Sequence, residues 1–424
     1  MNLDILKSVI FDQHEVIKNA NIVNRRYVFE KQGNYVLTGL RRAGKSTIMH
    51  KRVLDLIDSG VSWSQIVYIN FEDERLAEFS SLDFNDIVVL SSEMNKDESY
   101  FFFDEIQNIS GWEKFVRRLV DSGERVWITG SNAHMLSSQI ATVLGGRFMI
   151  KHITPYRFDE FLNASDINFN ESSIASSKGK GLILSTFEKF YQNGGFPESL
   201  LYSNVRDYVE SIYQKVLLGD VVARNKIRNP SAMRLLIKKI AECVCSETSV
   251  SGLHGNLKAL GYNLGKATLI DYIEKAQEAY ILFDVKNAVA KFVDREGSPK
   301  RYFSDNGLLN LFLVNKEPAL LENEIAVALS DVYGDNLHYL KSNKYEIDID
   351  FYLPEDGLAV QVAYALTDTS KQREIKNLLK LVKVDSDVKK LVVVTKNQEG
   401  LIEKEGVKID VTPAWKFLLR LSDL

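Results

Sequence analysis

Eight residues near the start of the chain have the types and spacing of a phosphate-binding loop. Residues 39–46 read GLRRAGKS, which fits G-x-x-x-x-G-K-[ST], and they lie between an apolar β-branched run at 35–38 and helical spacing at 47–54. Backbone N–H groups at the start of a helix point at an anion, and the helix macrodipole adds to the attraction. We therefore predict that this loop binds the phosphates of ATP through Gly39, Arg41, Arg42, Ala43, Gly44, Lys45, Ser46 and Thr47.

Individual side chains around this loop can be given roles in phosphoryl chemistry. Lys45 would neutralise the β- and γ-phosphate oxygens, and the Ser46 hydroxyl would hold Mg²⁺. The apolar run at 100–103 ends in Asp104, which we predict to be the carboxylate on the Mg²⁺ side. Adjacent residues of an extended segment point to opposite sides, so Glu105 is better placed to orient or deprotonate the attacking water. The alternative is a buried strand that ends in a solvated acidic turn.

Two later positions complete the predicted catalytic set. The strand-like run at 125–130 is followed by Ser131 and Asn132, and we favour Asn132 as the polar group that touches the γ-phosphate or the water. Arg147 follows two glycines, and in an oligomeric ATPase such an arginine reaches the γ-phosphate of a neighbouring subunit. An ordinary surface arginine is the alternative. The predicted catalytic residues are thus Glu105, Asn132 and Arg147.

The elements that must position these groups read as alternating strands and helices. Strand-like runs at 35–38, 65–71, 100–103 and 125–130 are separated by stretches with helical spacing. This alternation predicts an α/β fold with a mostly parallel sheet, whose ligands bind at the carboxyl ends of its strands. All the groups named above except Arg147 follow such strand ends.

Length and composition set the broad class. A chain of 424 residues is too long for one core, and its 45% hydrophobic and 26% charged residues are ordinary for a globular protein. A net charge of −4 argues against a protein that coats nucleic acid over its whole surface. Cys243 and Cys245 are too close on a helical stretch for a disulfide and too few for a zinc site. No signal peptide or membrane-spanning run is recognised, so we expect a cytoplasmic protein.

Breaks in the pattern suggest where the chain divides. We predict an ATPase core at 1–155, a helical lid at 156–228, a middle domain at 229–315 and a C-terminal domain at 316–424.

The middle domain has the order of a winged helix. Helical runs at 232–243, 249–260 and 266–279 precede two strand-like runs at 280–285 and 300–303, which would form the wing. Residues 214–301 hold 15 Lys and Arg against 9 Asp and Glu, which keeps DNA open as a partner. The third helix presents carboxylates at Asp271, Glu274 and Glu278, which argues for a lid or protein contact instead. Backbone contact with DNA through Lys286, Lys291, Lys300 and Arg301 on the wing is a separate hypothesis.

The C-terminal domain has the outline of a metal-dependent nuclease with parts missing. Strand-like runs at 345–352 and 358–363 form a hairpin, as in restriction-type nucleases, where one strand supplies an acid and the next an E-x-K triplet. Here the triplet offers Gln361 and Ala363, so an anionic metal ligand and the lysine are both lost. Asp350, Asp348 and Glu324 could still bind a cation weakly. We therefore expect a structural or docking role and no nuclease activity.

The chain resembles the prokaryotic AAA-type P-loop ATPases that carry a C-terminal domain of unknown function. The resemblance rests on residues 38–47 (TGLRRAGKST), 69–73 (INFED), 103–107 (FDEIQ), 129–132 (TGSN), 146–147 (GR), 191–198 (YQNGGFPE) and 218–224 (LGDVVAR). It implies ATP binding, probable hydrolysis, a winged helix after the lid and a restriction-endonuclease-like C-terminal domain. The departures from the family lie at Gln361 and Ala363.

These observations predict a Mg²⁺-dependent ATPase that acts as a nucleotide-driven switch on DNA or a protein partner, through movement of the lid and winged helix. The alternative is a nucleotide-gated binding module with negligible hydrolysis. The expected cofactors are ATP and Mg²⁺, and a homo-oligomer is required if Arg147 acts between subunits.

Overall fold

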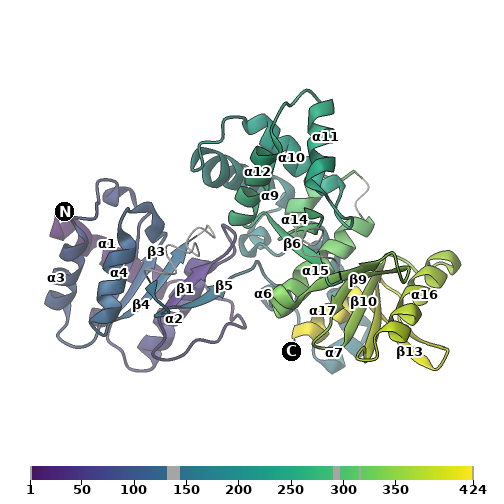
Figure 1. Ribbon diagram of the computed structural model, residues 1–424. Helices are drawn as coiled ribbons and strands as arrows, with labels where there is room; N and C mark the ends of the chain where they lie inside the picture. The colour runs from purple at the N-terminus through teal and green to yellow at the C-terminus, as the bar shows by residue number, and fades with distance from the viewer. Residues whose placement is uncertain (1, 131–143, 290–296, 315–316, 423–424) are drawn as a thin grey trace. The chain divides into compact units, whose positions relative to one another are not determined.

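The computed structural model describes residues 2–130, 144–289, 297–314 and 317–422, and the chain forms two compact units, Met1–Thr154 and Pro155–Leu424. Each unit is built around one sheet, and elements of both units carry labels in Figure 1. Asn132, one of the predicted catalytic residues, lies outside the described residues.

A five-stranded parallel sheet forms the centre of the first unit. Its order is β2-β3-β4-β1-β5, and every pair of neighbours runs parallel. The strands are β1 (Tyr35–Thr38), β2 (Ile66–Asn70), β3 (Tyr100–Asp104), β4 (Arg125–Gly130) and β5 (Met149–His152). Strands β1 to β4 are almost wholly buried, whereas the edge strand β5 is mostly exposed. The predicted parallel sheet is confirmed, with each of the predicted strands present.

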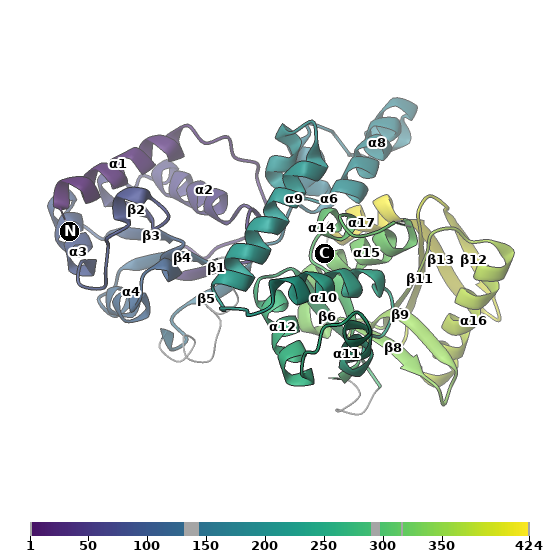
Figure 2. The same ribbon diagram turned by 90° about the horizontal axis from the view of Figure 1, so that it is seen from above.

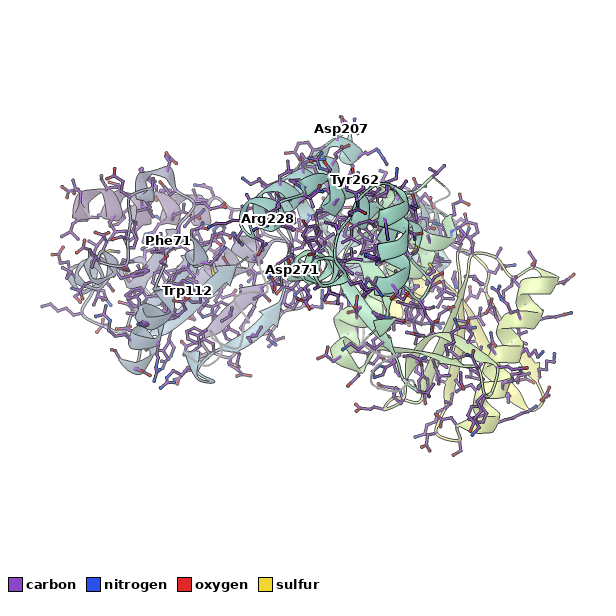
Figure 3. The ribbon with its side chains drawn as sticks, turned by 45° about the horizontal axis from the view of Figure 1, so that its top comes forward. Phe71, Trp112, Asp207, Arg228, Tyr262 and Asp271 are labelled. Atoms are coloured by element: carbon purple, nitrogen blue, oxygen red, sulfur yellow. The ribbon has the colours of Figure 1, made fainter. Side chains whose placement is uncertain are left out.

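Helices cover both faces of this sheet. They are α1 (Leu3–Lys18), α2 (Lys45–Asp58), α3 (Phe84–Met94) and α4 (Trp112–Asp121). On one face, α3 and α4 pack against alternate strand residues in a cluster rich in phenylalanine, where the rings of Phe84 and Phe115 stack at 4.4 Å. Phe71, at the end of β2, and Trp112, at the start of α4, belong to the same cluster and are labelled in Figure 3. The strands packed in this core carry the candidate site residues at their carboxyl ends.

The second unit begins with helices. They are α6 (Phe158–Ala164), α7 (Glu171–Ala175), α8 (Ser177–Asn193), α9 (Val205–Lys215), α10 (Pro230–Glu242), α11 (Val250–Ala259) and α12 (Lys266–Glu278). Helix α9 continues into a π-helical segment, Val216–Ala223. The three predicted helices of the middle domain correspond to α10, α11 and α12. Asp271 lies exposed on α12 (Figure 3).

An eight-stranded sheet follows, in the order β12-β13-β11-β10-β9-β8-β6-β7. Its strands are β6 (Leu282–Asn287), β7 (Lys300–Phe303), β8 (His338–Ser342), β9 (Ile347–Leu353), β10 (Leu358–Ala363), β11 (Lys390–Thr395), β12 (Gly400–Lys404) and β13 (Val407–Pro413). Helices α14 (Asn306–Asn310), α15 (Glu317–Tyr333), α16 (Asp368–Val384) and α17 (Ala414–Ser422) accompany it. The sheet can be followed in Figure 2 from β6 in green to β12 near the yellow end of the scale.

The hairpin predicted as the wing forms, but it is part of this larger sheet. Strands β6 and β7 pair antiparallel, and β6 also pairs parallel with β8 through Lys286 and Asn287. Middle and C-terminal segments therefore share one sheet, and the finer division into lid, winged helix and nuclease-like domain stays a prediction.

The wing hypothesis is wrong for two of its four basic residues. Lys300 and Arg301 are 4% and 3% exposed, so neither side chain is available to a phosphate backbone. Lys300 pairs with two carboxylates, and Arg301 donates to the carbonyl of Thr248 and pairs with Asp284 at 3.4 Å. Sequence alternation could not reveal this burial, because the partners lie on other elements: Glu322 and Asp350 follow Lys300 in the chain, whereas Thr248 and Asp284 precede Arg301. Lys291 lies outside the described residues.

The glycine pair in the run 191–198 has a structural role. Asp305 accepts hydrogen bonds from the backbone N–H groups of Gly195 (2.8 Å) and Gly307 (2.7 Å). A Cβ at Gly194, whose φ is 77°, would lie 1.9 Å from the Asp305 carboxylate. Burial raises the pKa of Asp305 to about 6, although these N–H groups favour its charged form. The pair thus lets the end of α8 approach the N-cap of α14.

Candidate nucleotide-binding site

The loop between β1 and α2 has the backbone shape that phosphate binding requires. Gly39 and Gly44 have φ values of 140° and 95°, and Gly44 is the N-cap of α2. A Cβ at Gly39 would lie 2.0 Å from the carbonyl oxygen of Ile153, so only glycine fits. Arg42 also adopts a left-handed conformation, with φ of 66°. The loop therefore curls over the start of α2, where unpaired N–H groups gather.

Lys45 is the first residue of α2, and its ammonium group lies over the loop. Its Nζ atom donates to the carbonyls of Gly39 (3.0 Å) and Leu40 (3.1 Å), and the residue is 5% exposed. A positive charge held at the loop is where the β- and γ-phosphates of a nucleotide would need one. Ser46 follows in the first turn of the helix and is partly buried.

Asp104 lies at the end of β3 with its carboxylate held on both oxygens. Thr129, on the neighbouring strand β4, donates its hydroxyl to one oxygen, and the Tyr68 hydroxyl donates to the other at 3.2 Å. Asp104 is 4% exposed. Burial and the charge of Asp104 raise the pKa of Tyr68 well above its ordinary value, so the phenol stays a donor. The carboxylate is therefore fixed in orientation before any ligand binds.

Glu105 follows Asp104 directly, but it does not continue the extended strand. Its φ of 52° places it in the left-handed region, which breaks the strand at this residue. The backbone N–H of Glu105 donates to the Thr129 hydroxyl at 2.9 Å, and the Gln107 side-chain amide donates to the Glu105 carboxylate. One hydroxyl on β4 thus positions both acids.

Arg25 is a contributor that the sequence reasoning missed. Its guanidinium donates to the carbonyl of Ala43 in the loop and to the carbonyl of Thr154, each at 2.9 Å. The Tyr27 hydroxyl accepts from the backbone N–H of Thr154 at 3.1 Å. The segment before β1 is therefore tied to both the loop and Thr154, two residues after β5. No local pattern marks Arg25, because its partners lie 18 and 129 residues away.

Two other arginines show different placements. Arg41, in the loop, pairs with Glu72 at 2.7 Å, which links the loop to the segment after β2. Arg147 lies two residues before β5, and its carbonyl accepts from Asn34, which precedes β1. The loop follows the opposite end of β1, so Arg147 is at the far edge of the sheet from Lys45. There it pairs with Asp121 at 2.6 Å. The structure brings together Lys45, Asp104 and Glu105 at one sheet edge, and it does not bring Arg147 to them.

The chemistry of these groups fits a Mg–nucleotide. The loop leads into the N-terminus of α2, Lys45 supplies a cation, and Ser46 and Asp104 supply the hard oxygen atoms that Mg²⁺ prefers. Thr38, buried at the end of β1, has a hydroxyl oxygen with no hydrogen-bond partner among the described residues. When bound, Mg²⁺ would neutralise charge on the β- and γ-phosphates.

Comparison with known proteins agrees with this geometry. A family model for an AAA domain matches residues 31–162, and one for a domain of unknown function (DUF8612) matches residues 184–319. An uncharacterized protein of Methanocaldococcus jannaschii is 31% identical over 438 residues, covering 98% of this chain and 95% of that protein. The chain belongs to this family of AAA-type P-loop ATPases. Another relative in the family, from Haemophilus influenzae, is 26% identical and covers 90% of this chain and 93% of its own.

Solved structures of P-loop ATPases are also similar to this AAA-type ATPase, at low superposition scores. The Walker-type ATPase of Pyrococcus abyssi has a TM-score of 0.42 and 12% identity, covering 70% of this chain and 99% of its own. AMPPCP-bound DnaA from Aquifex aeolicus has a TM-score of 0.26 and 15% identity, covering 64% and 88%. Among the described residues, no helix combines the length and apolarity needed to cross a membrane.

Proposed function

We propose that the protein is a Mg²⁺-dependent ATPase whose nucleotide state switches the contact of its second unit with a partner macromolecule. The observation that carries the proposal is the convergence of Lys45, Asp104 and Glu105 at the carboxyl edge of one parallel sheet. Binding alone would need the loop and its lysine. A second acid beside Asp104 is the feature that hydrolysis needs.

Glu105→Gln tests the hydrolytic part of the proposal. The amide keeps the size of the side chain but accepts protons poorly, so ATP should bind with unchanged affinity while phosphate release falls by about 100-fold or more. Gln107→Ala is the control, since it removes the partner of Glu105 but not the carboxylate. Normal turnover by Glu105→Gln would end the assignment of this residue as the general base or water-orienting group.

The partner we propose is a protein rather than duplex DNA. The excess of basic residues in the segment 214–301 includes Lys300 and Arg301, which are buried and paired within the fold. On α12, the exposed positions include Thr268, Asp271 and Glu274, and carboxylates there would repel phosphates. Lys275 is paired with Glu278 at 2.9 Å on the same helix.

A salt titration of DNA binding decides between the two partners. Fluorescence anisotropy with a labelled duplex should show weak binding whose salt dependence does not change in Lys286→Ala. A steep salt dependence that becomes shallower in Lys286→Ala would instead favour DNA. The runner-up function, a binding module with negligible hydrolysis, is supported if single-turnover assays show no phosphate release with or without DNA.

A further inference from the structure

A cluster of charged side chains lies inside the second unit, at the place where a nuclease of this outline would hold its metal. Lys300 on β7 extends its Nζ atom to Asp350 on β9 (3.1 Å) and to Glu322 on α15 (3.2 Å). Lys300 and Glu322 are 4% and 8% exposed. The Tyr302 hydroxyl also donates to Glu322, at 2.7 Å. The two carboxylates therefore share an ammonium group that comes from the chain itself.

Other acceptor and donor groups around this cluster are also engaged. The second oxygen of Asp350 accepts from the backbone N–H of Val362 at 2.9 Å. Gln361 accepts from the Asp350 N–H at 2.7 Å and donates to Glu374 at 2.7 Å. Arg373 donates to the other oxygen of Glu374 at 2.9 Å. Each of these carboxylates thus has a positive or N–H partner within the chain.

The sequence-based expectation about this cluster needs one correction. The sequence predicts that Glu324 and Asp350 are ligands of the same cation. In the structure, Glu322 is the residue of α15 that is linked to Asp350, through Lys300. Residues two apart on a helix point about 200° apart, so only one of them can face β9. Burial raises the pKa of Glu324 well above its ordinary value, as does the charge of Asp305, and Lys396 opposes this rise.

These residues do not fit a divalent cation. An amide at Gln361 and a methyl group at Ala363 stand where a nuclease of this outline has an anionic ligand and a lysine. Lys300 lies between Asp350 and Glu322 and pairs with both. Among the described residues, no group of three or more histidine, cysteine, aspartate or glutamate side chains is arranged to hold a metal. Burial opposes the charge of Lys300, but Asp350 and Glu322 outweigh it and raise its pKa above the ordinary value.

We infer that Lys300 is a built-in cation that replaces the metal ion of a nuclease-like site and joins the β6–β7 hairpin to the C-terminal strands. Asp350 and Glu322 then do not bind a divalent cation, and the domain serves as a rigid part of the second unit. The inference is independent of the nucleotide site, since every residue that carries it lies in Pro155–Leu424.

Manganese binding to the full-length, nucleotide-free protein tests this inference. Titration followed by electron paramagnetic resonance should give the same Mn²⁺ binding for the wild type and Asp350→Asn. Lys300→Met, which removes the ammonium but keeps the stem, should gain about one Mn²⁺ site per chain, because two close carboxylates then lack a counter-ion. That site should be lost again in Lys300→Met with Asp350→Asn.

Three results would overturn the inference. The first is Mn²⁺ binding by the wild type that disappears in Asp350→Asn. The second is a folded Lys300→Met that gains no Mn²⁺ site. If Lys300→Met does not fold, the inference is tested by thermal unfolding of the double variant, Lys300→Met with Asp350→Asn. Recovery of folding when Asp350 is neutralised supports a counter-ion role, whereas continued failure is the third contradicting result.

Discussion

Thr129 and Asp104 are joined by a buried hydrogen bond from the threonine hydroxyl to the carboxylate, across the neighbouring strands β4 and β3. The same hydroxyl accepts the backbone N–H of Glu105 at 2.9 Å. A single side chain therefore holds the Asp104 carboxylate and the backbone of Glu105, the two residues that we assign to Mg²⁺ and to the attacking water. Thr129 itself carries no titratable group, so we assign it a positioning role and no part in proton transfer.

Thr129→Val is expected to lower turnover more than nucleotide binding. The substitution keeps the shape of the side chain but removes the group that holds both acids, so kcat should fall about tenfold or more with a small change in the affinity for ATP. Tyr68→Phe is the matched comparison, because it removes only the 3.2 Å hydrogen bond to Asp104. Phosphate-release assays and nucleotide titrations on the two variants measure the difference. An equal loss in both would show that Thr129 does not position Glu105.

Arg25→Ala is expected to weaken nucleotide binding without touching the phosphate loop sequence. A hydrogen bond to a charged group contributes about 1.5–3 kcal/mol, so loss of the contact to Ala43 should raise the Kd for ATP about tenfold. The Kd of Arg25→Lys for ATP should lie between those of the wild type and Arg25→Ala. One ammonium group cannot span both the Ala43 and Thr154 carbonyls in the fork geometry of a guanidinium. Unchanged affinity in Arg25→Ala would remove this residue from the site.

Arg147 can act on ATP only from a neighbouring subunit, since it lies at the opposite sheet edge from Lys45. If it does so, Arg147→Ala should lower turnover about 1,000-fold while ATP binding stays normal. Arg117→Ala is the control, because Arg117 also pairs with Asp121, at 3.5 Å, and lies on α4. Sizing of the wild type with and without ATP belongs to the same test. A protein that stays monomeric with ATP, or equal turnover in both variants, would leave Arg147 as a surface residue.

The first unit should lose stability in mild acid. Burial lowers the pKa of His50 to about 4, so the folded unit keeps this histidine neutral while the unfolded chain takes up a proton below about pH 6.5. The free energy of unfolding therefore falls as the pH drops from about 6.5 to about 4, by at most about 3 kcal/mol from this residue. Burial also lowers the pKa of His14, which adds a contribution of the same sign.

Urea unfolding of wild type and His50→Gln, at about pH 7 and about pH 5, measures this effect. The variant should lose less stability between the two conditions than the wild type. Equal losses would mean that His50 is not kept neutral by the fold.

The first unit could be predicted largely from local patterns. The phosphate loop and the strands around it combine a fixed spacing with apolar runs, and β1 and β4 match the predicted bounds at both ends. The direction of the Glu105 side chain stays a prediction, because it assumed an extended backbone and the structure has Glu105 in the left-handed region, with φ of 52°. The fold of this unit follows from features that lie within a few residues of one another.

The residues that sequence reasoning misplaced depend on distant partners. Lys300 was read as a basic residue on an exposed wing, but Asp350 and Glu322 reach it from elements 50 and 22 residues away. Glu324 is named by the sequence analysis and Glu322 is not; which of the two faces the sheet depends on how α15 is rotated, and no pattern within the helix fixes that rotation. Arg25 was missed because it acts on backbone carbonyls, which any residue can supply.

Isothermal titration calorimetry with Mg–ATP, on the wild type and on Lys45→Ala, tests the central claim most directly. Lys51→Ala, six residues further along α2, is the matched control. We predict saturable binding of one nucleotide per chain by the wild type and Lys51→Ala, and none by Lys45→Ala under conditions where circular dichroism shows all three to be folded. Absence of binding by the folded wild type, or equal binding by Lys45→Ala, would contradict the claim.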